Sequence, residues 1–248
     1  MAFRVASYNL VRRIACIAVC SSLSLLAKAP ERSVEVTTVD KEDLAGGGTI
    51  RISTVDGELH VEGWDQPTVE ITLARTAFCH ASAKEMEEGE ARLKGIEVVV
   101  RKTNSGDLEI SSRFPARNWL LRTFRGPGDF SLDYRVKVPR NAKLVIRHDV
   151  GDVLLHGVAA DIDARNRAGD IVLQLPETDR YAIDARCEIG NVYSDFDGAH
   201  RSPHLVGEQF DTTAVEVHRI HLRVLIGGIS IQKASAPLAG VLAPGSTR

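Results

Sequence analysis

The chain has 248 residues, of which 44% are hydrophobic and 26% are charged, and its formal net charge is −2. This length can bury a core in one domain or at most two, and the composition is that of an ordinary globular protein rather than a disordered or fibrous one. The mild acidity gives no reason to expect nucleic acid as a partner.

Residues 1–29 have the order of a secretory signal peptide. Arg4, Arg12 and Arg13 make its start basic, an uncharged apolar run follows, and it ends in Ala27-Lys28-Ala29, which fits a small-x-small cleavage site. The apolar run is short for a membrane-spanning helix, and an uncleaved anchor is the alternative. We therefore expect an exported protein, periplasmic or at the cell surface, in which residues 30–46 form a linker.

Cleavage after Ala29 would change the formal net charge from −2 to −6, because residues 1–29 contain four basic and no acidic residues. It would also leave two of the four cysteines, Cys79 and Cys187. An oxidising compartment permits a disulfide between them. Two separate buried thiols are the alternative.

From residue 47 onward one pattern recurs six times. Each copy has a glycine, an aliphatic residue two positions after it and another aliphatic residue seven positions before it. Apolar residues two apart are typical of a strand, and glycine accepts the positive φ of a tight bend. Each copy is therefore predicted to be a short strand, a bend and a second short strand. The six glycines are Gly57, Gly106, Gly151, Gly169, Gly190 and Gly227.

Two segments interrupt this pattern, and the first is predicted to be a helix. Ser82 is followed three residues later by Glu85, which is a capping-box arrangement. The stretch from about Ser82 to Lys94 is then polar and rich in helix formers, and Gly95 ends it. The sequence therefore predicts one short helical insertion.

The second interruption, residues 111–130, concentrates arginine and aromatic residues in an otherwise acidic chain. Such a segment is either a lid over an open end of the repeat or a contact surface for an anionic glycan, a lipid head group or a protein. In the second interpretation the candidate binding residues are Arg113, Arg117, Trp119, Arg122, Phe124 and Arg125.

The last four glycines follow one another after 18, 21 and 37 residues, the last interval being close to two units. This spacing is typical of the coils of a parallel β-solenoid, in which each coil buries its apolar face by stacking on the next. We predict an all-β, parallel β-solenoid-like repeat domain over residues 47–233. An antiparallel β-sandwich of hairpins has the same alternation and is the alternative. Residues 234–248 are expected to be a flexible tail.

Stacked coils would align equivalent residues in ladders. The inward positions are predicted to be buried and two charged positions to be exposed, one four residues before the glycine and one directly after it. A solvated charged face explains these charges, and a ligand-binding stripe is the alternative. The inward set is Ile162, Ile171, Ile183, Val192 and Ile220. The charged sets are Lys102, Arg147, Arg165, Arg186 and Arg223, and Asp107, Asp152 and Asp170.

Three stretches together carry a resemblance to a known group. They are "GTIRISTVDGELHVEGW", "DYRVKVPRNAKLVIRHDVGDVLLHGV" and "RVLIGGISIQ". With these stretches, residues 47–233 resemble the bacterial putative-adhesin domain family, an exported repeat domain of unknown function. The resemblance implies an all-β repeat fold and carries over no catalytic residues.

The histidines and serines do not form a catalytic or metal pattern. His218 and His221 are three apart on a predicted strand and would face opposite sides, and His200 and His204 lack a third ligand nearby. No glycine elbow flanks a serine. We therefore expect a non-catalytic binding or scaffold module of the cell envelope, with no cofactor and no metal. The alternative is a polysaccharide-acting β-solenoid enzyme, in which carboxylates and arginines would meet in one groove.

Overall fold

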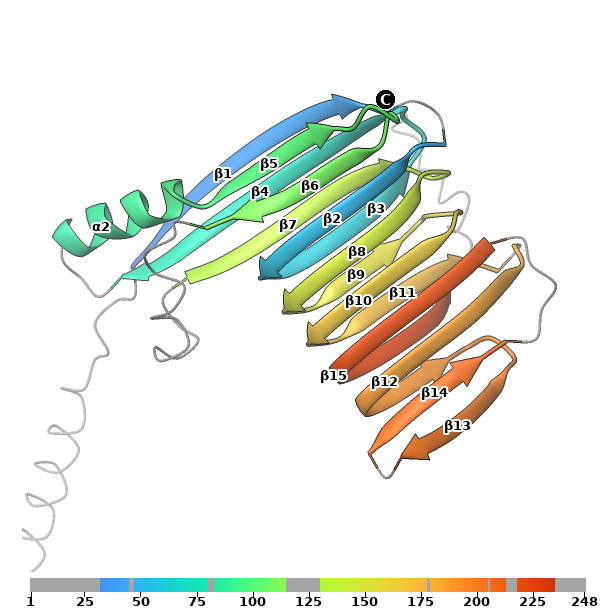
Figure 1. Cartoon of the computed structure of the whole chain (residues 1–248). Coiled ribbons are helices and arrows are strands. Elements are labelled where there is room, and N and C mark those ends of the chain that lie inside the picture. Colours follow the sequence, from blue (N-terminus) through green and yellow to red (C-terminus); the bar gives the residue numbers. More distant parts are fainter. Residues whose placement is uncertain are drawn as a thin grey trace, which may run out of the picture.

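The structure is a computed structural model that describes residues 32–44, 47–79, 83–114, 130–177, 179–204, 206–212 and 218–234. Most of the described residues are in strands, with one helix among them, so the class is nearly all-β as expected (Figure 1). The elements in chain order are β1 (Arg32–Asp43), β2 (Thr49–Asp56), β3 (Glu58–Trp64), β4 (Thr68–Cys79), α2 (Ala83–Lys94), β5 (Glu97–Lys102), β6 (Leu108–Arg113), β7 (Phe130–Pro139), β8 (Lys143–Val150), β9 (Val153–His156), β10 (Ile162–Ala168), β11 (Ile171–Pro176), β12 (Tyr181–Ser194), β13 (Ala199–His204), β14 (Gly207–Asp211) and β15 (His218–Ala234).

The strands form one curled, mixed sheet that folds back on itself in two rows (Figure 1). The first row has the order β5-β6-β2-β8-β10-β15-β12-β14-β13, and the second row has the order β1-β4-β7-β3-β9-β11-β15-β12. The long strands β12 and β15 belong to both rows, because each bends at a glycine within its length. Parallel pairing dominates the middle of both rows, and antiparallel pairing occurs toward their ends.

Five of the six predicted units stack in register. Ile162 of β10 pairs with Leu144 of β8 and with Ile220 of β15, and Ile220 in turn pairs with Ile183 of β12. All of these pairings are parallel, and in the units of Gly57, Gly151 and Gly169 the two strands pair with neighbouring units rather than with each other. The repeat alignment therefore predicted which residues become neighbours between these five units.

The five stacked glycines lie in one column at the corner between the two rows. A β-carbon on Gly151 would lie 1.9 Å from the carbonyl oxygen of Gly57, and one on Gly169 would lie 2.2 Å from that of Gly151. Gly151 has a φ of 122° and Gly169 a φ of 121°, which side chains rarely allow. The Gly-Asp pairs are therefore corners, and Asp170 there accepts a backbone N–H bond from Gly228 of β15 at 2.7 Å.

Inside the corners, polar side chains bond to the carbonyl oxygens of this glycine column. His148 places Nε2 3.0 Å from the Gly57 oxygen, and Asn166 donates to the Gly151 oxygen at 2.8 Å. Because a carbonyl only accepts, Nε2 of His148 carries the proton, and Nδ1 accepts from the Thr54 hydroxyl at 2.7 Å. These side chains occupy the position three residues before the glycine, where the sequence pattern gave no expectation.

Cys187 occupies the same corner position in β12 and is a free, buried thiol. Its Sγ donates to the Gly227 oxygen at 3.2 Å, and burial raises the pKa of this thiol. The backbone of Cys79 ends β4, which β7, β3, β9, β11 and β15 separate from β12 in the sheet order. The disulfide considered from the sequence is therefore absent from this structure.

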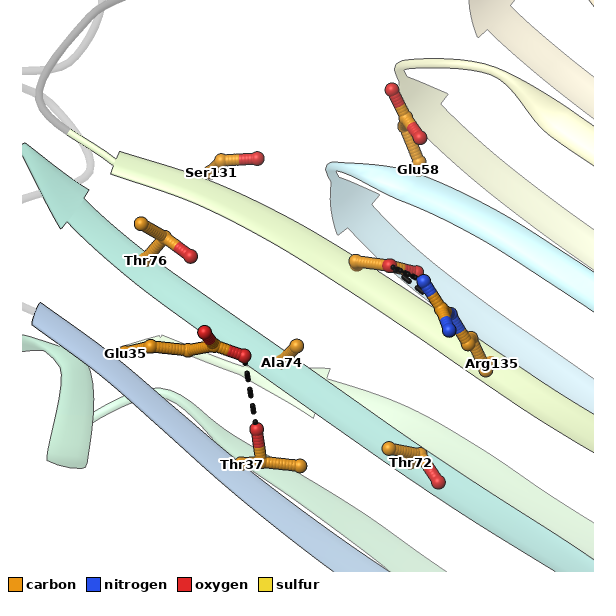
Figure 2. A pocket seen from close by; sticks show the side chains of 9 residues that line it. Glu35, Thr37, Glu58, Thr72, Ala74, Thr76, Ser131 and Arg135 are labelled. Carbon is orange, nitrogen blue, oxygen red and sulfur yellow. Dashed lines mark hydrogen bonds and ion pairs between the residues drawn. The ribbon is translucent and has the colours of Figure 1, made fainter. Parts of the chain in front are cut away.

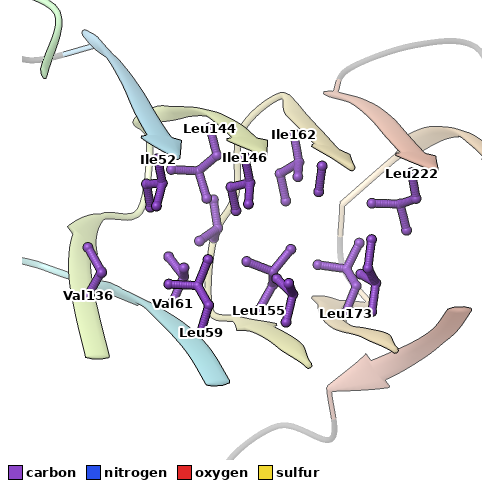
Figure 3. Packing of buried hydrophobic residues seen from close by; sticks show 14 of the residues in the cluster. Ile52, Leu59, Val61, Val136, Leu144, Ile146, Leu155, Ile162, Leu173 and Leu222 are labelled. Atoms are coloured by element: carbon purple, nitrogen blue, oxygen red, sulfur yellow. The ribbon is translucent and has the colours of Figure 1, made fainter. Parts of the chain in front are cut away.

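The core lies between the two rows, where aliphatic side chains from both meet (Figure 3). Leu144, Ile146 and Ile162 from the first row face Leu155 and Leu173 from the second, and each is at most 1% exposed. The five predicted inward residues are buried, as expected. Arg165 and Asp170 are exposed as predicted, whereas the side chain of Arg186 is 34% exposed and so only half-buried.

Three expectations need correction. The Gly106 unit joins the sheet differently from the others: β5 and β6 pair antiparallel as a hairpin, and only β6 continues the first row, pairing parallel with β2. Lys102 is therefore not part of the basic column. The range 30–46, expected to be a linker, contains β1, which pairs with β4 along its whole length. The sheet is mixed rather than parallel throughout, so it is the coarser class of nearly all-β that holds.

The helix α2 begins and ends close to the predicted positions and packs against β1 and β4. Arg75 of β4 is 4% exposed and fixes the end of the helix, with Nη1 donating to the Ile96 oxygen at 2.5 Å and to the Leu93 oxygen at 3.4 Å. Carbonyls at a helix C-terminus carry partial negative charge, so a guanidinium stabilises them. Among the described residues, no helix is both long and apolar enough to cross a membrane.

Candidate functional site

The outer face of β1, β4, β7 and β3 carries a hollow of about 390 Å³, which we call the polar trough (Figure 2). Its floor consists of small or hydroxyl-bearing side chains, and its rim carries carboxylates and one guanidinium. The nine lining residues are Glu35, Thr37, Glu58, Thr72, Ala74, Thr76, Ser131, Asp133 and Arg135.

Antiparallel register brings these residues together from distant parts of the sequence. Thr37 of β1 pairs with Ala74 of β4, and Ala74 pairs with Asp133 of β7. Side chains two apart on a strand point to the same face of the sheet. The residues that pair two positions further along β1, β4 and β7 therefore lie on the same outer face as this first set. The hollow exists because Ala74 is small while longer side chains such as Glu35 and Arg135 rise on either side (Figure 2).

The charges of the trough are held in fixed positions. Arg135 donates to Oδ2 of Asp133 from Nη2 at 2.8 Å and from Nε at 3.2 Å, and this bond raises the pKa of the guanidinium. Thr37 donates from Oγ1 to Oε1 of Glu35 at 3.4 Å. The other oxygen of Asp133, Oδ1, is buried and has no hydrogen-bond partner among the described groups. The trough therefore offers acceptors, hydroxyls and a guanidinium to a polar ligand.

A second feature lies on the outer face of the first row and is made of one arginine from each of four neighbouring strands. These four, which we call the arginine row, are Arg147, Arg165, Arg223 and Arg186, in the order of β8, β10, β15 and β12. The sequence predicted this column but not its order, because β15 lies between β10 and β12. A shallow depression of about 300 Å³ borders the row.

The predicted arginine–aromatic cluster is described only at its start. Arg113 ends β6 with an exposed side chain, and Phe114 packs partly buried against the core. Arg117, Trp119, Arg122, Phe124 and Arg125 lie outside the described residues. Whether that segment is a lid or a contact surface therefore stays a prediction.

The histidines take separate positions. The His218 ring packs 6.0 Å from that of Tyr181, whereas His221 bonds from Nδ1 to Asp184 at 3.1 Å on the outer face. His200 is paired with Glu208 at 3.0 Å. Within the part of the chain that the structure describes, His, Cys, Asp and Glu form no group of three that could hold a metal.

Solved structures that are similar to this chain include two bacterial proteins. No family model matches the chain, and neither does any curated protein. The crystal structure of a putative cell adhesion protein from Clostridium sporogenes is 8% identical, covers 81% of this chain and 100% of its own, and has a TM-score of 0.45. That of a putative adhesin from Bacteroides fragilis is 12% identical, covers 80% and 97%, and has a TM-score of 0.27. At these TM-scores neither structure bears on where this chain binds.

Proposed function

We propose that the chain is an exported, non-catalytic, adhesin-like binding module of the bacterial cell envelope, and that the polar trough holds a segment of a glycan. The polar trough carries this proposal. Its hydroxyls, carboxylates and guanidinium face solvent from a hollow large enough for a sugar ring, on strands that the sheet holds rigid. Sugars present arrays of hydroxyl groups, which both donate and accept hydrogen bonds.

Asp133 supplies the most specific reason for a ligand that donates hydrogen bonds. A buried acceptor without a partner costs about 1–3 kcal/mol. Oδ1 of Asp133 is such an acceptor, while Oδ2 is held by Arg135. Because Oδ1 is covered in this structure, a sugar hydroxyl must displace a neighbouring side chain to reach it. That contact would remove the cost, so we expect Asp133 to contribute most to binding.

The rest of the molecule serves as a scaffold in this proposal. The five in-register units form a solenoid-like stack that keeps both outer faces rigid, and the arginine–aromatic segment from Arg113 to Arg125 adds a further contact. Export, as the first 29 residues predict, would place the module in the periplasm or at the surface. The partner is then an envelope glycan, and nucleic acid is not expected.

One observation favours a second candidate, a polysaccharide-acting enzyme. The polar trough brings the carboxylates of Glu35, Glu58 and Asp133 into one hollow with Arg135. Glycoside hydrolysis uses two carboxyl groups, one of which must hold a proton as the general acid. Oδ2 of Asp133 already accepts two N–H groups of Arg135, so this oxygen is not available to a leaving group, which favours a binding role for the trough.

The test fills the hollow without changing its charge. Ala74→Phe should abolish binding of the mature protein on an array of bacterial envelope glycans, because the ring would occupy the floor of the trough. Val172→Phe, a matched change on the outer face of β11, should leave binding intact. Equal binding by the two variants, or no glycan bound by the wild type, would sink the proposal. Release of reducing ends from a bound glycan would support the enzyme instead.

A further inference from the structure

The arginine row places like charges side by side at the spacing of neighbouring strands. Strand spacing is about 4.8 Å, so four arginines in register extend over about 14 Å. Like charges directly opposite one another on a sheet are destabilising unless other groups offset them. The groups that pair with each arginine therefore determine which guanidinium N–H groups remain available to a ligand.

Three members of the row are anchored by carboxylates. Arg186 is held by Glu188, with Nε 2.9 Å from Oε1 and Nη2 3.2 Å from Oε2. Arg147 makes a two-point contact with Asp163, from Nη1 to Oδ1 at 3.2 Å and from Nη2 to Oδ2 at 3.0 Å. Arg223 is held by Asp184, with Nη2 2.5 Å from Oδ2 and Nη1 donating to the backbone oxygen at 3.0 Å. Partial burial opposes ionisation of the two aspartate carboxyls, but the arginine contacts outweigh it and lower the pKa of Asp163 and of Asp184.

Two further arginines have no such anchor. The side chain of Arg165 is 54% exposed and reaches Asp163 only at 3.6 Å, and that of Arg167 is 60% exposed and reaches Asp149 only at 3.9 Å. Both distances exceed those of a good charge-assisted hydrogen bond. Most N–H groups of Arg165 and Arg167 are therefore available to a ligand.

The depression of about 300 Å³ lies where the anchored and unanchored arginines meet. Arg147, Arg165, Arg167 and Arg223 all line it, so that four guanidinium groups share the lining with the two carboxylates of Asp149 and Glu188. The exposed side chain of Leu225 also lines it. It is an open hollow along the stack rather than an enclosed pocket, so it fits a chain running across strands better than a small ion.

We propose that this depression and the arginine row bind a linear polyanionic glycan, whose carboxylate or sulfate groups pair with Arg165 and Arg167 while Arg147 and Arg223 shape the site. The planar guanidinium fork matches carboxylate and sulfate oxygens two at a time. The site is distinct from the polar trough, which lies on the outer face of the second row.

The lining residues favour a glycan over the two other polyanions that arginine attracts. Single-stranded nucleic acid is held by aromatic side chains on which bases stack, and among the described residues no aromatic side chain other than His148, which is 3% exposed, lines the depression. A membrane surface requires a broad apolar face, whereas Leu225 is the one exposed apolar residue of the described lining.

The test compares two double variants of the mature full-length protein that remove the same charge. The probe is polygalacturonate, a linear polyuronate, with uncharged dextran as the control ligand. Arg165→Ser with Arg167→Ser should weaken binding at least about tenfold, the effect of losing a single charge-assisted hydrogen bond. Arg101→Ser with Arg201→Ser, at exposed positions of β5 and β13, should change it less than about twofold. Thermal melts of both should stay close to wild type, because exposed charges contribute little to stability.

Further variants and probes distinguish the arginine row from overall charge and from the arginine–aromatic segment. Arg165→Lys with Arg167→Lys keeps the positive charge and loses the planar guanidinium fork. Its affinity for polygalacturonate should therefore lie between that of the wild type and that of the serine variant. Equal losses in both serine variants would mean that only overall charge matters, and retention by Arg165→Ser with Arg167→Ser would place the site elsewhere. Loss only with Arg117, Arg122 and Arg125 changed to Ser would assign polyanion binding to that segment. Tighter binding of oligo-dT or of phosphatidylglycerol vesicles than of polygalacturonate would overturn the choice of a glycan.

Discussion

Gly106 and Gly151 begin the same local sequence, Gly-Asp followed by aliphatic residues, but they end in different structures. Gly151 turns the chain from one row to the other inside the stack, and a β-carbon there would lie 1.9 Å from the Gly57 oxygen. Gly106 turns a hairpin between β5 and β6, and a β-carbon there would meet nothing within 4 Å. Both have positive φ, 122° for Gly151 and 84° for Gly106.

The difference shows that the local motif specifies a bend, whereas the neighbouring unit specifies what kind of bend. At Gly151 the next unit's backbone excludes any side chain. At Gly106 a side chain would meet no such backbone, although the Thr49 N–H of the Gly57 unit donates to Asp107 at 3.1 Å. The two strands that this turn joins pair with each other. Stacking is therefore a property of the contact between units rather than of the single unit.

The strongest way to break the stack is to add a methyl group at its corner. Gly151→Ala should lower the free energy of unfolding by about 5 kcal/mol or more, because backbone must move as well as adopt a strained φ. In Gly106→Ala the only cost is the strained positive φ, so the free energy of unfolding should fall by about 1–2 kcal/mol. Urea unfolding of the two variants measures both free energies. Similar losses would mean that the contact between units is not what requires glycine at the corner.

Core truncation should also separate the two regions, by a smaller amount. Ile171 in the stack is 0% exposed, and Ile171→Ala should cost about 2–5 kcal/mol. Val100 in the hairpin is partly buried, and Val100→Ala should cost about 1 kcal/mol because less apolar surface is lost from the core. Asp170→Ala, which removes one exposed corner hydrogen bond, should also cost about 1 kcal/mol. A larger effect for the aspartate than for the isoleucine would contradict the role of Gly-Asp as a corner.

The smallest predicted effect depends on pH and belongs to the corner interior. Burial lowers the pKa of His148 below its ordinary value of about 6.5. Below that pH the unfolded chain binds a proton that the folded chain does not, so stability falls as the pH falls from 6.5 toward the folded pKa, by at most about 1.4 kcal/mol per pH unit. Above about 6.5 this contribution is constant.

The matched variant for this prediction is His148→Asn, which copies Asn166 of the next unit. Its amide can donate to the Gly57 oxygen as Asn166 donates to the Gly151 oxygen, and it does not titrate. The difference in unfolding free energy between wild type and His148→Asn should therefore grow less favourable to wild type as the pH falls from 7.5 to 5. A difference that stays constant over this range would mean that His148 is protonated equally in both states.

The features that could be predicted from the sequence are those with a local signal. Alternating aliphatic residues before a glycine identified the buried positions such as Ile162 and Ile220, and positive φ at the bends follows from glycine alone. The repeat alignment also gave the arginine row, because equivalent positions in stacked units become neighbours. The segment from Ser82 to Lys94 had its own helical signal.

The remaining features depend on contacts between distant residues. Nothing near Gly106 reveals that its strands pair with each other, since the same alternation suits a hairpin and a stacked unit. The polar trough combines Thr37, Ala74 and Asp133, which are ordinary outward residues until the register of β1, β4 and β7 brings them together. The position of β15 between β10 and β12 likewise depends on which strands pair with each other, and no local sequence pattern predicts that pairing.

That position of β15 has a consequence for how the chain is made. The strand lies in the middle of the stack, pairing with β10 and β11 on one side and β12 on the other, yet its 17 residues are the last of the described fold. A polypeptide emerging from its N-terminus therefore exposes two open strand edges until β15 arrives, and open edges invite pairing with other chains. Synthesis that stops before His218 would leave the described strands β12, β13 and β14 unpaired with the rest of the sheet. Continuity of the described sheet is thus established only when β15 leaves the ribosome.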